Sequence, residues 1–206
     1  YDDMMEFSFG LWGPPTDGLF GLGFKSINIG RSQIKGLEIA VAGEGAIGSV
    51  EITALGSYTF TVPIIDDKNY VYYTDSTGVA LNYFSTSSDT SGLLKYRYQH
   101  LAKFDFNAQY NRLSFGFSFR YNSAMENIDY VFESTDLEAI RPLGIKASRD
   151  RLNNTTTIID LRMGYEITEN SALSFNIDNS LNREYLQRPA SLGPPRTFSL
   201  LYKLQF

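Results

Sequence analysis

Cysteine is absent from the 206 residues, and His100 is the only histidine. The lack of thiols excludes a disulfide framework and thiolate metal sites, and a single imidazole is a poor basis for a metal or haem centre. Basic charge is also scarce, because the net charge is −5, whereas a nucleic-acid-binding domain needs a basic face. We therefore expect no metal, no cofactor and no nucleic-acid partner.

Long hydrophobic runs are missing as well. No stretch approaches the roughly 18 consecutive apolar residues that a membrane-spanning helix needs. The chain opens at Tyr1 without the charged start and apolar core of a signal peptide, so it fits either a mature protein or an excerpt from a longer polypeptide. A membrane β-barrel stays open, because each of its strands needs only about 9–11 residues of alternating polarity.

Aromatic residues are abundant, at 15% of the chain, and they alternate with polar residues at a period of two. Phe115, Phe117 and Phe119 share one face of a segment whose other face carries Ser118 and Arg120, which is the pattern of a β-strand. The same alternation predicts an all-β, antiparallel fold of about eight strands. These strands are expected at residues 1–9, 35–43, 49–62, 102–110, 114–121, 159–167, 173–178 and 197–206.

Alternation alone also fits a soluble β-sandwich, so other features must decide which face meets lipid. The polar face mixes small residues with charges of both signs, such as Lys103 and Asp105, as a water-filled lumen would. Tyrosines such as Tyr58 and Tyr110 sit at strand ends, where an interfacial girdle belongs. Together these features favour a transmembrane β-barrel.

The connections between the predicted strands alternate in length, as they do in outer-membrane barrels, where periplasmic turns are short and extracellular loops are long. The last strand would then end at the periplasmic side. The short connections are 44–48, 111–112 and 168–171, and the long ones are about 10–34, 63–96, 123–154 and 181–196.

The last strand closes on apolar residues at alternate positions: Leu200, Tyr202, Leu204 and Phe206. This pattern resembles the C-terminal recognition signal of outer-membrane proteins, which the barrel-assembly machinery reads. An exposed edge strand with an aromatic end is a feature that a strand-pairing insertase can grip.

Four further motifs, in this order, resemble those of the TonB-dependent receptor family. They are NIGRSQIKGLE at 28–38, GSYTF at 56–60, DNSLNREY at 178–185 and PPRTF at 194–198. One departure is Ser180, where the family usually has Leu, and we interpret it as lumen-side variation.

The resemblance implies a barrel of about 22 strands plugged by an N-terminal domain, with residues 1–206 forming the C-terminal part of the barrel domain. The plug and the first strands would lie upstream. It also implies active uptake of a scarce ligand, most often a ferric siderophore or similar chelate, across the outer membrane of a Gram-negative bacterium. Implied partners are TonB, acting through the plug, the barrel-assembly machinery, outer-membrane lipid and lipopolysaccharide, and the small-molecule ligand. The alternative is a complete eight-stranded barrel with a structural or adhesive role.

Candidate ligand contacts lie in the long loops, because aromatic faces and guanidinium groups suit an anionic or aromatic chelate. Loop arginines that contact lipopolysaccharide or stay solvated remain an alternative. His100 is expected to point outward, away from any serine and carboxylate, so we expect no catalytic residues and no enzyme. The candidates are Tyr70, Tyr72 and Tyr73 in the second loop, Arg141, Arg149 and Arg151 in the third, and Arg183, Arg188 and Arg196 in the fourth.

Overall fold

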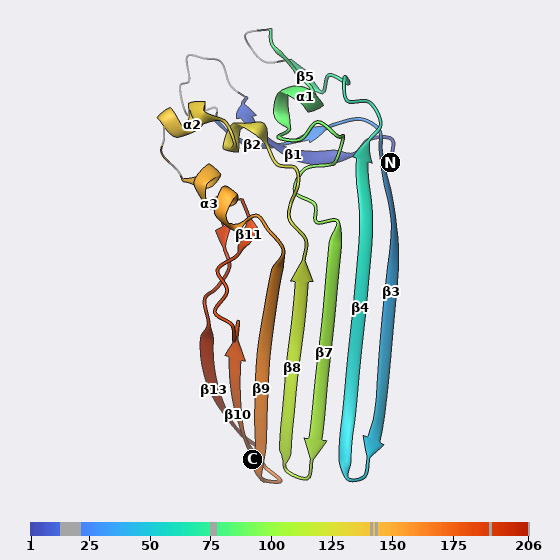
Figure 1. The fold of residues 1–206 in the computed structure, drawn as a ribbon, viewed down its shortest axis with the longest axis vertical. Coiled ribbons are helices and arrows are strands. Elements are labelled where there is room, and N and C mark those ends of the chain that lie inside the picture. The colour runs from blue at the N-terminus through green and yellow to red at the C-terminus, as the bar shows by residue number, and fades with distance from the viewer. Residues whose placement is uncertain (13–21, 75–77, 141, 143, 190, 206) are drawn as a thin grey trace.

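The computed structural model describes residues 1–12, 22–74, 78–140, 142, 144–189 and 191–205. Its main feature is one antiparallel sheet of seven strands, ordered β13-β10-β9-β8-β7-β4-β3 (Figure 1). We call this sheet the wall. Its strands are β3 (Ser32–Ile47), β4 (Val50–Ile65), β7 (His100–Tyr110), β8 (Leu113–Asn122), β9 (Thr156–Thr168), β10 (Ser171–Asp178) and β13 (Thr197–Leu204).

Three two-residue turns connect neighbouring wall strands, and all three lie at the same end of the sheet (Figure 1). Gly48 and Asn111 begin two of these turns with φ values of 61° and 52°, a left-handed conformation that Gly and Asn adopt at low cost. The turn predicted at 44–48 is shorter than expected, because β3 continues to Ile47 and pairs there with Val50.

The first predicted strand is not part of the wall. β1 (Met5–Leu11) pairs with β2 (Leu22–Asn28) in a separate two-stranded sheet at the opposite end from the turns. The prediction of eight strands in one sheet is therefore corrected to seven within the described part of the chain. Alternation identified the segment 1–9 as a strand, but alternation does not name a pairing partner.

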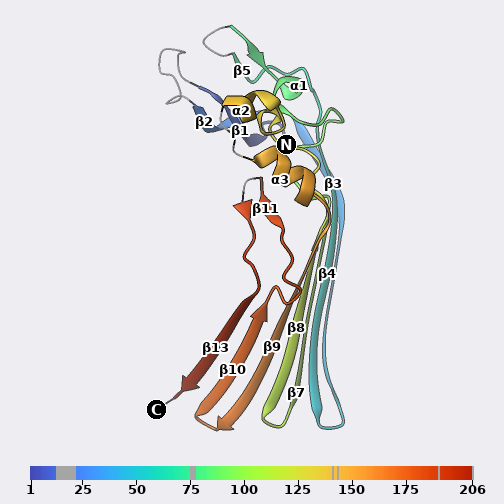
Figure 2. The same cartoon turned by 60° about the vertical axis from the view of Figure 1, so that its left-hand side comes forward.

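The wall is open. In the described residues β3 pairs only with β4, and β13 pairs only with β10. Figure 2 shows that the sheet twists and curves without closing on itself. A complete small barrel, the alternative from the sequence, would require the first and last strands to pair.

The apolar face of the wall is uncovered. Phe115, Met163 and Leu200 are 44%, 46% and 70% exposed, although each lies within a paired strand. In a soluble sandwich a second layer would pack on this face about 10 Å away, but no described element does so. No helix in the described ranges is long and apolar enough to cross a membrane. So large an apolar surface indicates contact with a partner or with lipid.

The opposite face of the wall is polar and internally paired. Arg162 donates to both carboxylate oxygens of Asp105 at 2.9 Å and to the Ser118 hydroxyl at 2.7 Å. Arg120 donates to Asp160 at 3.0 Å on the same face. This face therefore has the mixture of charges expected for a watered lumen.

The remaining described segments gather at the end of the wall opposite the turns (Figure 1). We call the described residues within 1–31, 66–99, 123–155 and 179–196 the loop assembly. Short elements lie within the long connections predicted from the sequence. Besides β1 and β2 these are β5 (Tyr73–Thr74), β6 (Ala80–Leu81), α1 (Tyr83–Thr86), η2 (Tyr130–Phe132), α2 (Thr135–Ile140), α3 (Ile145–Leu152), β11 (Leu186–Arg188) and β12 (Ser191–Leu192).

Most buried apolar side chains lie in the loop assembly and not on the wall. They form two clusters, one around Leu94 and one around Ile128. The first contains Ile27, Ile29, Tyr83 and Leu94 together with Ile65 at the end of β4, and the second contains Met125, Ile128, Phe132 and Ile145. The loop assembly thus has a small core of its own, which fixes the positions of its polar side chains.

Candidate functional site

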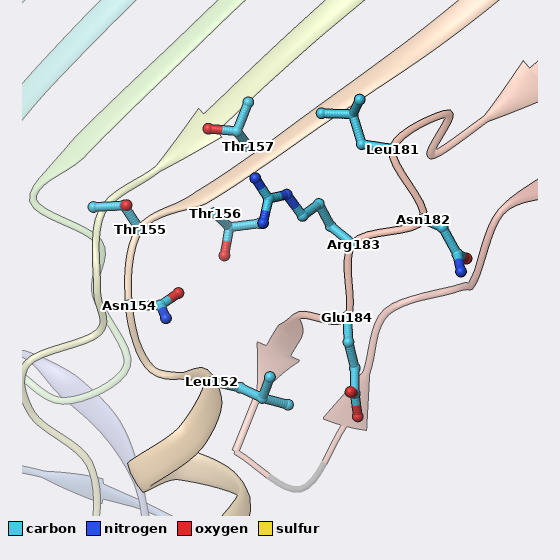
Figure 3. A pocket seen from close by; sticks show the side chains of 9 residues that line it. All are labelled: Leu152, Asn154, Thr155, Thr156, Thr157, Leu181, Asn182, Arg183 and Glu184. Atoms are coloured by element: carbon cyan, nitrogen blue, oxygen red, sulfur yellow. The ribbon is translucent and has the colours of Figure 1, made fainter.

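A hollow of about 750 Å³ lies where the loop assembly meets the start of β9 and the end of β10 (Figure 3). Three segments form its lining. They contribute Leu152 at the end of α3, Asn154 to Thr157 at the start of β9, and Leu181 to Glu184 after β10. Its lining is mostly polar, with amide, hydroxyl and charged groups side by side.

Arg183 is the cation of this hollow. Its side chain reaches across the hollow toward Thr156 (Figure 3), and it is exposed without a hydrogen bond or ion pair to any described residue. Its backbone is held by the buried Asn179, whose amide accepts from Arg183 N at 2.9 Å and donates to Arg183 O at 2.8 Å. A fixed backbone and a free guanidinium fork suit recognition of an anionic oxygen group.

Arg151 and Glu184 form an ion pair at the rim of the hollow. Two N–H groups of Arg151 donate to the two oxygens of Glu184, each at 2.8 Å. The Arg151 hydrogen bonds hold the pKa of Glu184 below its ordinary range. The pair connects α3 to the segment before β11, so it also holds together two of the segments that line the hollow.

The three candidate tyrosines lie in a different part of the loop assembly. Tyr70 is exposed and packs over Gly30. Tyr73 meets Trp12 edge-on at 5.0 Å, and the Lys25 ammonium lies 5.1 Å from its ring. The Tyr72 hydroxyl donates to Asn82 O at 2.6 Å and contacts Thr86, and burial raises its pKa. Tyr72 is therefore committed to internal packing.

The other candidate arginines are dispersed. Arg149 is buried in an ion pair with Glu133 and also donates to Glu126 O at 3.1 Å. Arg188 is exposed beside a small cavity that Arg149 also lines. Arg196 lies over the Phe198 ring at 5.7 Å. Arg141 lies outside the described residues.

His100 lies on the apolar face with two aromatic neighbours. Its Nδ1 is 2.8 Å from the Tyr58 hydroxyl, and its ring stacks on Phe60 at 4.8 Å. The described residues contain no cluster of three or more side chains able to hold a metal ion.

The proposed assembly signal lies on the free edge strand β13. Leu200, Tyr202 and Leu204 are exposed on its apolar face. Phe206 lies outside the described residues. The signal itself stays a prediction, although an unpaired strand edge is the feature that it requires.

Sequence reasoning missed the polar side of the hollow. Asn154 ended a predicted loop, and Thr155 and Thr156 fell between that loop and the next predicted strand, yet all three line the hollow. The run of Asn and Thr directly before a strand is a signal that could have identified them, because it concentrates hydrogen-bonding side chains at the strand end nearest the loops.

The family model "TonB dependent receptor-like, beta-barrel" matches residues 1–180. No curated protein sequence matches significantly.

Solved structures share the fold. The ferric-catecholate import receptor Fiu from E. coli K12 is 21% identical, with a TM-score of 0.53 over 90% of this chain and 22% of its own. The pyoverdine outer-membrane receptor FpvA from Pseudomonas aeruginosa PAO1 is 15% identical, with a TM-score of 0.53 over 99% of this chain and 25% of its own. The copper transporter OprC has the same identity and TM-score, over 99% of this chain and 27% of its own.

This chain spans about a quarter of the length of those solved structures. The seven-stranded open wall, its uncovered apolar face and the family match over residues 1–180 agree. The chain therefore belongs to the TonB-dependent receptor-like β-barrel family.

Proposed function

We propose that this chain is the C-terminal part of the barrel of an outer-membrane transporter in a Gram-negative bacterium. The transporter takes up a ferric siderophore or a similar chelate. The plug domain and the first barrel strands belong to the polypeptide upstream of residue 1, and TonB acts on the plug.

The observation that carries this proposal is the uncovered apolar face of an open wall. Seven strands expose Phe, Leu and Met side chains to one side, a surface that suits the hydrocarbon core of a bilayer. All long connections lie at one end of the wall, and all two-residue turns lie at the other. The loop assembly then faces the exterior, where a scarce ligand is captured.

The Arg183 hollow supports an oxygen-rich, anionic ligand. A planar guanidinium pairs with carboxylate or catecholate oxygens, and the Thr156 hydroxyl adds a hydrogen-bonding group beside it (Figure 3). Fiu and FpvA, which share this fold, are named for ferric-catecholate import and for pyoverdine. OprC, with the same fold, is a copper transporter, so the test includes copper.

The other partners follow from exposed features. Arg188 and Arg196 on the loop assembly suit the phosphates of lipopolysaccharide. The free edge of β13 suits the barrel-assembly machinery, which works by strand pairing. Tyr70 and Tyr73 offer aromatic surface to a ligand from the far side of the loop assembly.

Energised uptake by the full-length receptor tests the proposal. Cells lacking other iron receptors should accumulate radioactive iron from a ferric tris-catecholate or a ferric tris-hydroxamate. This accumulation should stop when TonB is deleted. Arg183→Ala should weaken capture by a factor of roughly 10 to 150, because a charge-assisted hydrogen bond contributes about 1.5–3 kcal/mol. Arg112→Ala, in the β7–β8 turn at the other end of the wall, is the matched control and should leave uptake unchanged.

Three results would contradict the proposal. One is uptake of copper but of neither iron chelate, which would replace the ligand class. Another is iron uptake that persists without TonB. The third is a mature polypeptide with a mass close to the 23.2 kDa of this chain, because such a polypeptide would be too short to include a plug.

A further inference from the structure

The loop assembly contains a buried cluster of one cation and two carboxylates. Lys95, Asp129 and Glu6 are 2%, 1% and 8% exposed. The Lys95 ammonium donates to Asp129 Oδ1 at 2.6 Å and to the buried Ser8 hydroxyl at 3.0 Å. It lies 3.8 Å from Glu6 Oε2, and Glu6 Oε1 accepts from Lys95 N at 2.8 Å.

The cluster connects three segments that are far apart in the sequence. Glu6 and Ser8 come from β1, Lys95 from the connection between β6 and β7, and Asp129 from the connection between β8 and η2. Ser8 donates to Asp129 at 3.0 Å, and the Tyr96 hydroxyl also donates to Asp129. The β1–β2 hairpin is therefore tied to two other loops through buried polar groups.

The charges in the cluster do not balance when both carboxylates are ionised. One ammonium then faces two carboxylates in a site with little water, which leaves one uncompensated negative charge at high cost. A proton on Glu6 restores neutrality and leaves Asp129 as the partner of Lys95. When the β1–β2 hairpin is packed against the other two loops, which we call its docked state, Glu6 is therefore favoured in its protonated form.

The surroundings of Glu6 offer little further compensation. The connection that carries Lys95 also carries Arg97, which is exposed and acts on Glu6 from a distance. The phenols of Tyr72 and Tyr83 lie within electrostatic range of Glu6 but are neutral, because burial raises their pKa values. Tyr96 is likewise neutral, since burial and Asp129 raise its pKa.

We propose that Glu6, Lys95 and Asp129 form a proton-dependent latch, which fastens the β1–β2 hairpin to the rest of the loop assembly while Glu6 is protonated and loosens it when Glu6 ionises. This latch is distinct from the Arg183 hollow. It requires only that the chain fold as described, so it can fail while the uptake proposal stands.

The pH window follows from linkage. Burial raises the pKa of Glu6 from 4.5 to about 7 in the docked state. Glu6 therefore binds its proton more tightly when the hairpin is docked than when it is undocked. Docking of the hairpin weakens as pH rises from 4.5 through about 7, with no further change above that range. Taking 4.5 for the undocked side chain, docking should be roughly thirtyfold weaker at about pH 8.5 than at about pH 5.5.

Hydrogen exchange of the full-length receptor in lipid nanodiscs tests the latch. Protection factors of peptides covering β1 and β2, corrected for the intrinsic pH dependence of exchange, should fall roughly thirtyfold between about pH 5.5 and about pH 8.5. In Glu6→Gln the side chain is permanently neutral and still accepts from Lys95 N, so protection at the higher pH should match that of the native protein at the lower pH. Glu126→Gln removes an exposed carboxyl from the same assembly and should keep the native pH profile.

Two outcomes would overturn the latch: equal protection at both pH values in the native receptor, or the same pH dependence in Glu6→Gln. If Glu6→Gln fails to fold, infrared titration of isotope-labelled Glu6 in the native receptor decides. A midpoint near 7 supports the latch, and a midpoint near the ordinary value contradicts it.

Discussion

The wall and the loop assembly are stabilised by different physical means. The wall has long paired strands, but its apolar face is uncovered, so its burial of hydrophobic surface depends on surrounding lipid. The loop assembly has short elements, yet it buries two apolar clusters and a charged one within itself. One chain thus combines a lipid-dependent sheet with a small water-facing core. A substitution that places a charge in lipid should therefore destabilise the wall alone. A substitution that disrupts the buried clusters should destabilise the loop assembly alone.

The largest expected effect is in the loop assembly. Lys95→Met leaves the Asp129 carboxylate buried without its cation, which should cost about 3–5 kcal/mol of loop-assembly stability. Hydrogen exchange should show lost protection in β1 and β2 while β7 and β8 keep theirs. Lys146→Met, which removes an exposed cation paired with Asp150, is the control and should change little. Equal loss of protection in the wall would break the division into two regions.

The next largest effect is in the wall. Phe117 lies on the apolar face, opposite Phe106 and Leu161. Phe117→Arg should destabilise the receptor by about 2–4 kcal/mol in urea unfolding from lipid vesicles, since it places a charge in hydrocarbon. Thr53→Arg, at a similar depth on the polar face and opposite Glu44, should cost far less. Similar losses of unfolding free energy in both variants would contradict the assignment of one face to lipid and the other to water.

A smaller effect should appear at a glycine where two strands approach closely. A Cβ on Gly36 would lie 2.2 Å from the Phe60 carbonyl oxygen, whereas a Cβ on Gly43 would meet nothing within 4 Å. Gly36→Ala should therefore cost about 1–3 kcal/mol through backbone displacement, measured by the same unfolding assay. Gly43→Ala, in the same strand, should be neutral or slightly stabilising. Loss of stability in Gly43→Ala alone would contradict this reading of β3.

Alternation predicted the wall because period two is a local property of each strand. The turn at Asn111-Arg112 was predicted because a polar pair interrupts two aromatic strands. The placement of 1–9 was wrong because pairing depends on where the rest of the chain folds. Likewise, the side chains of Tyr72 and Arg149 are committed to partners on other segments, and no local pattern reveals such contacts.

The candidate site was predictable only in part. Arg183 lines the hollow and Arg151 pairs with Glu184 at its rim, but whether these loop arginines bind a ligand stays a prediction. Their convergence depends on Asn179, whose buried amide fixes the backbone of Arg183. The latch around Lys95 was invisible in the sequence, because its three charged residues lie up to 123 positions apart.

The central claim is that one face of the wall meets lipid and the other meets water. Single cysteines placed in turn along β8, in a chain that has none of its own, can carry spin labels in the full-length receptor in lipid vesicles. We predict that labels at 115, 117 and 119 are accessible to oxygen, and that labels at 116, 118 and 120 are accessible to a water-soluble nickel reagent. Nickel access at the first set, or no alternation along the strand, would contradict the claim.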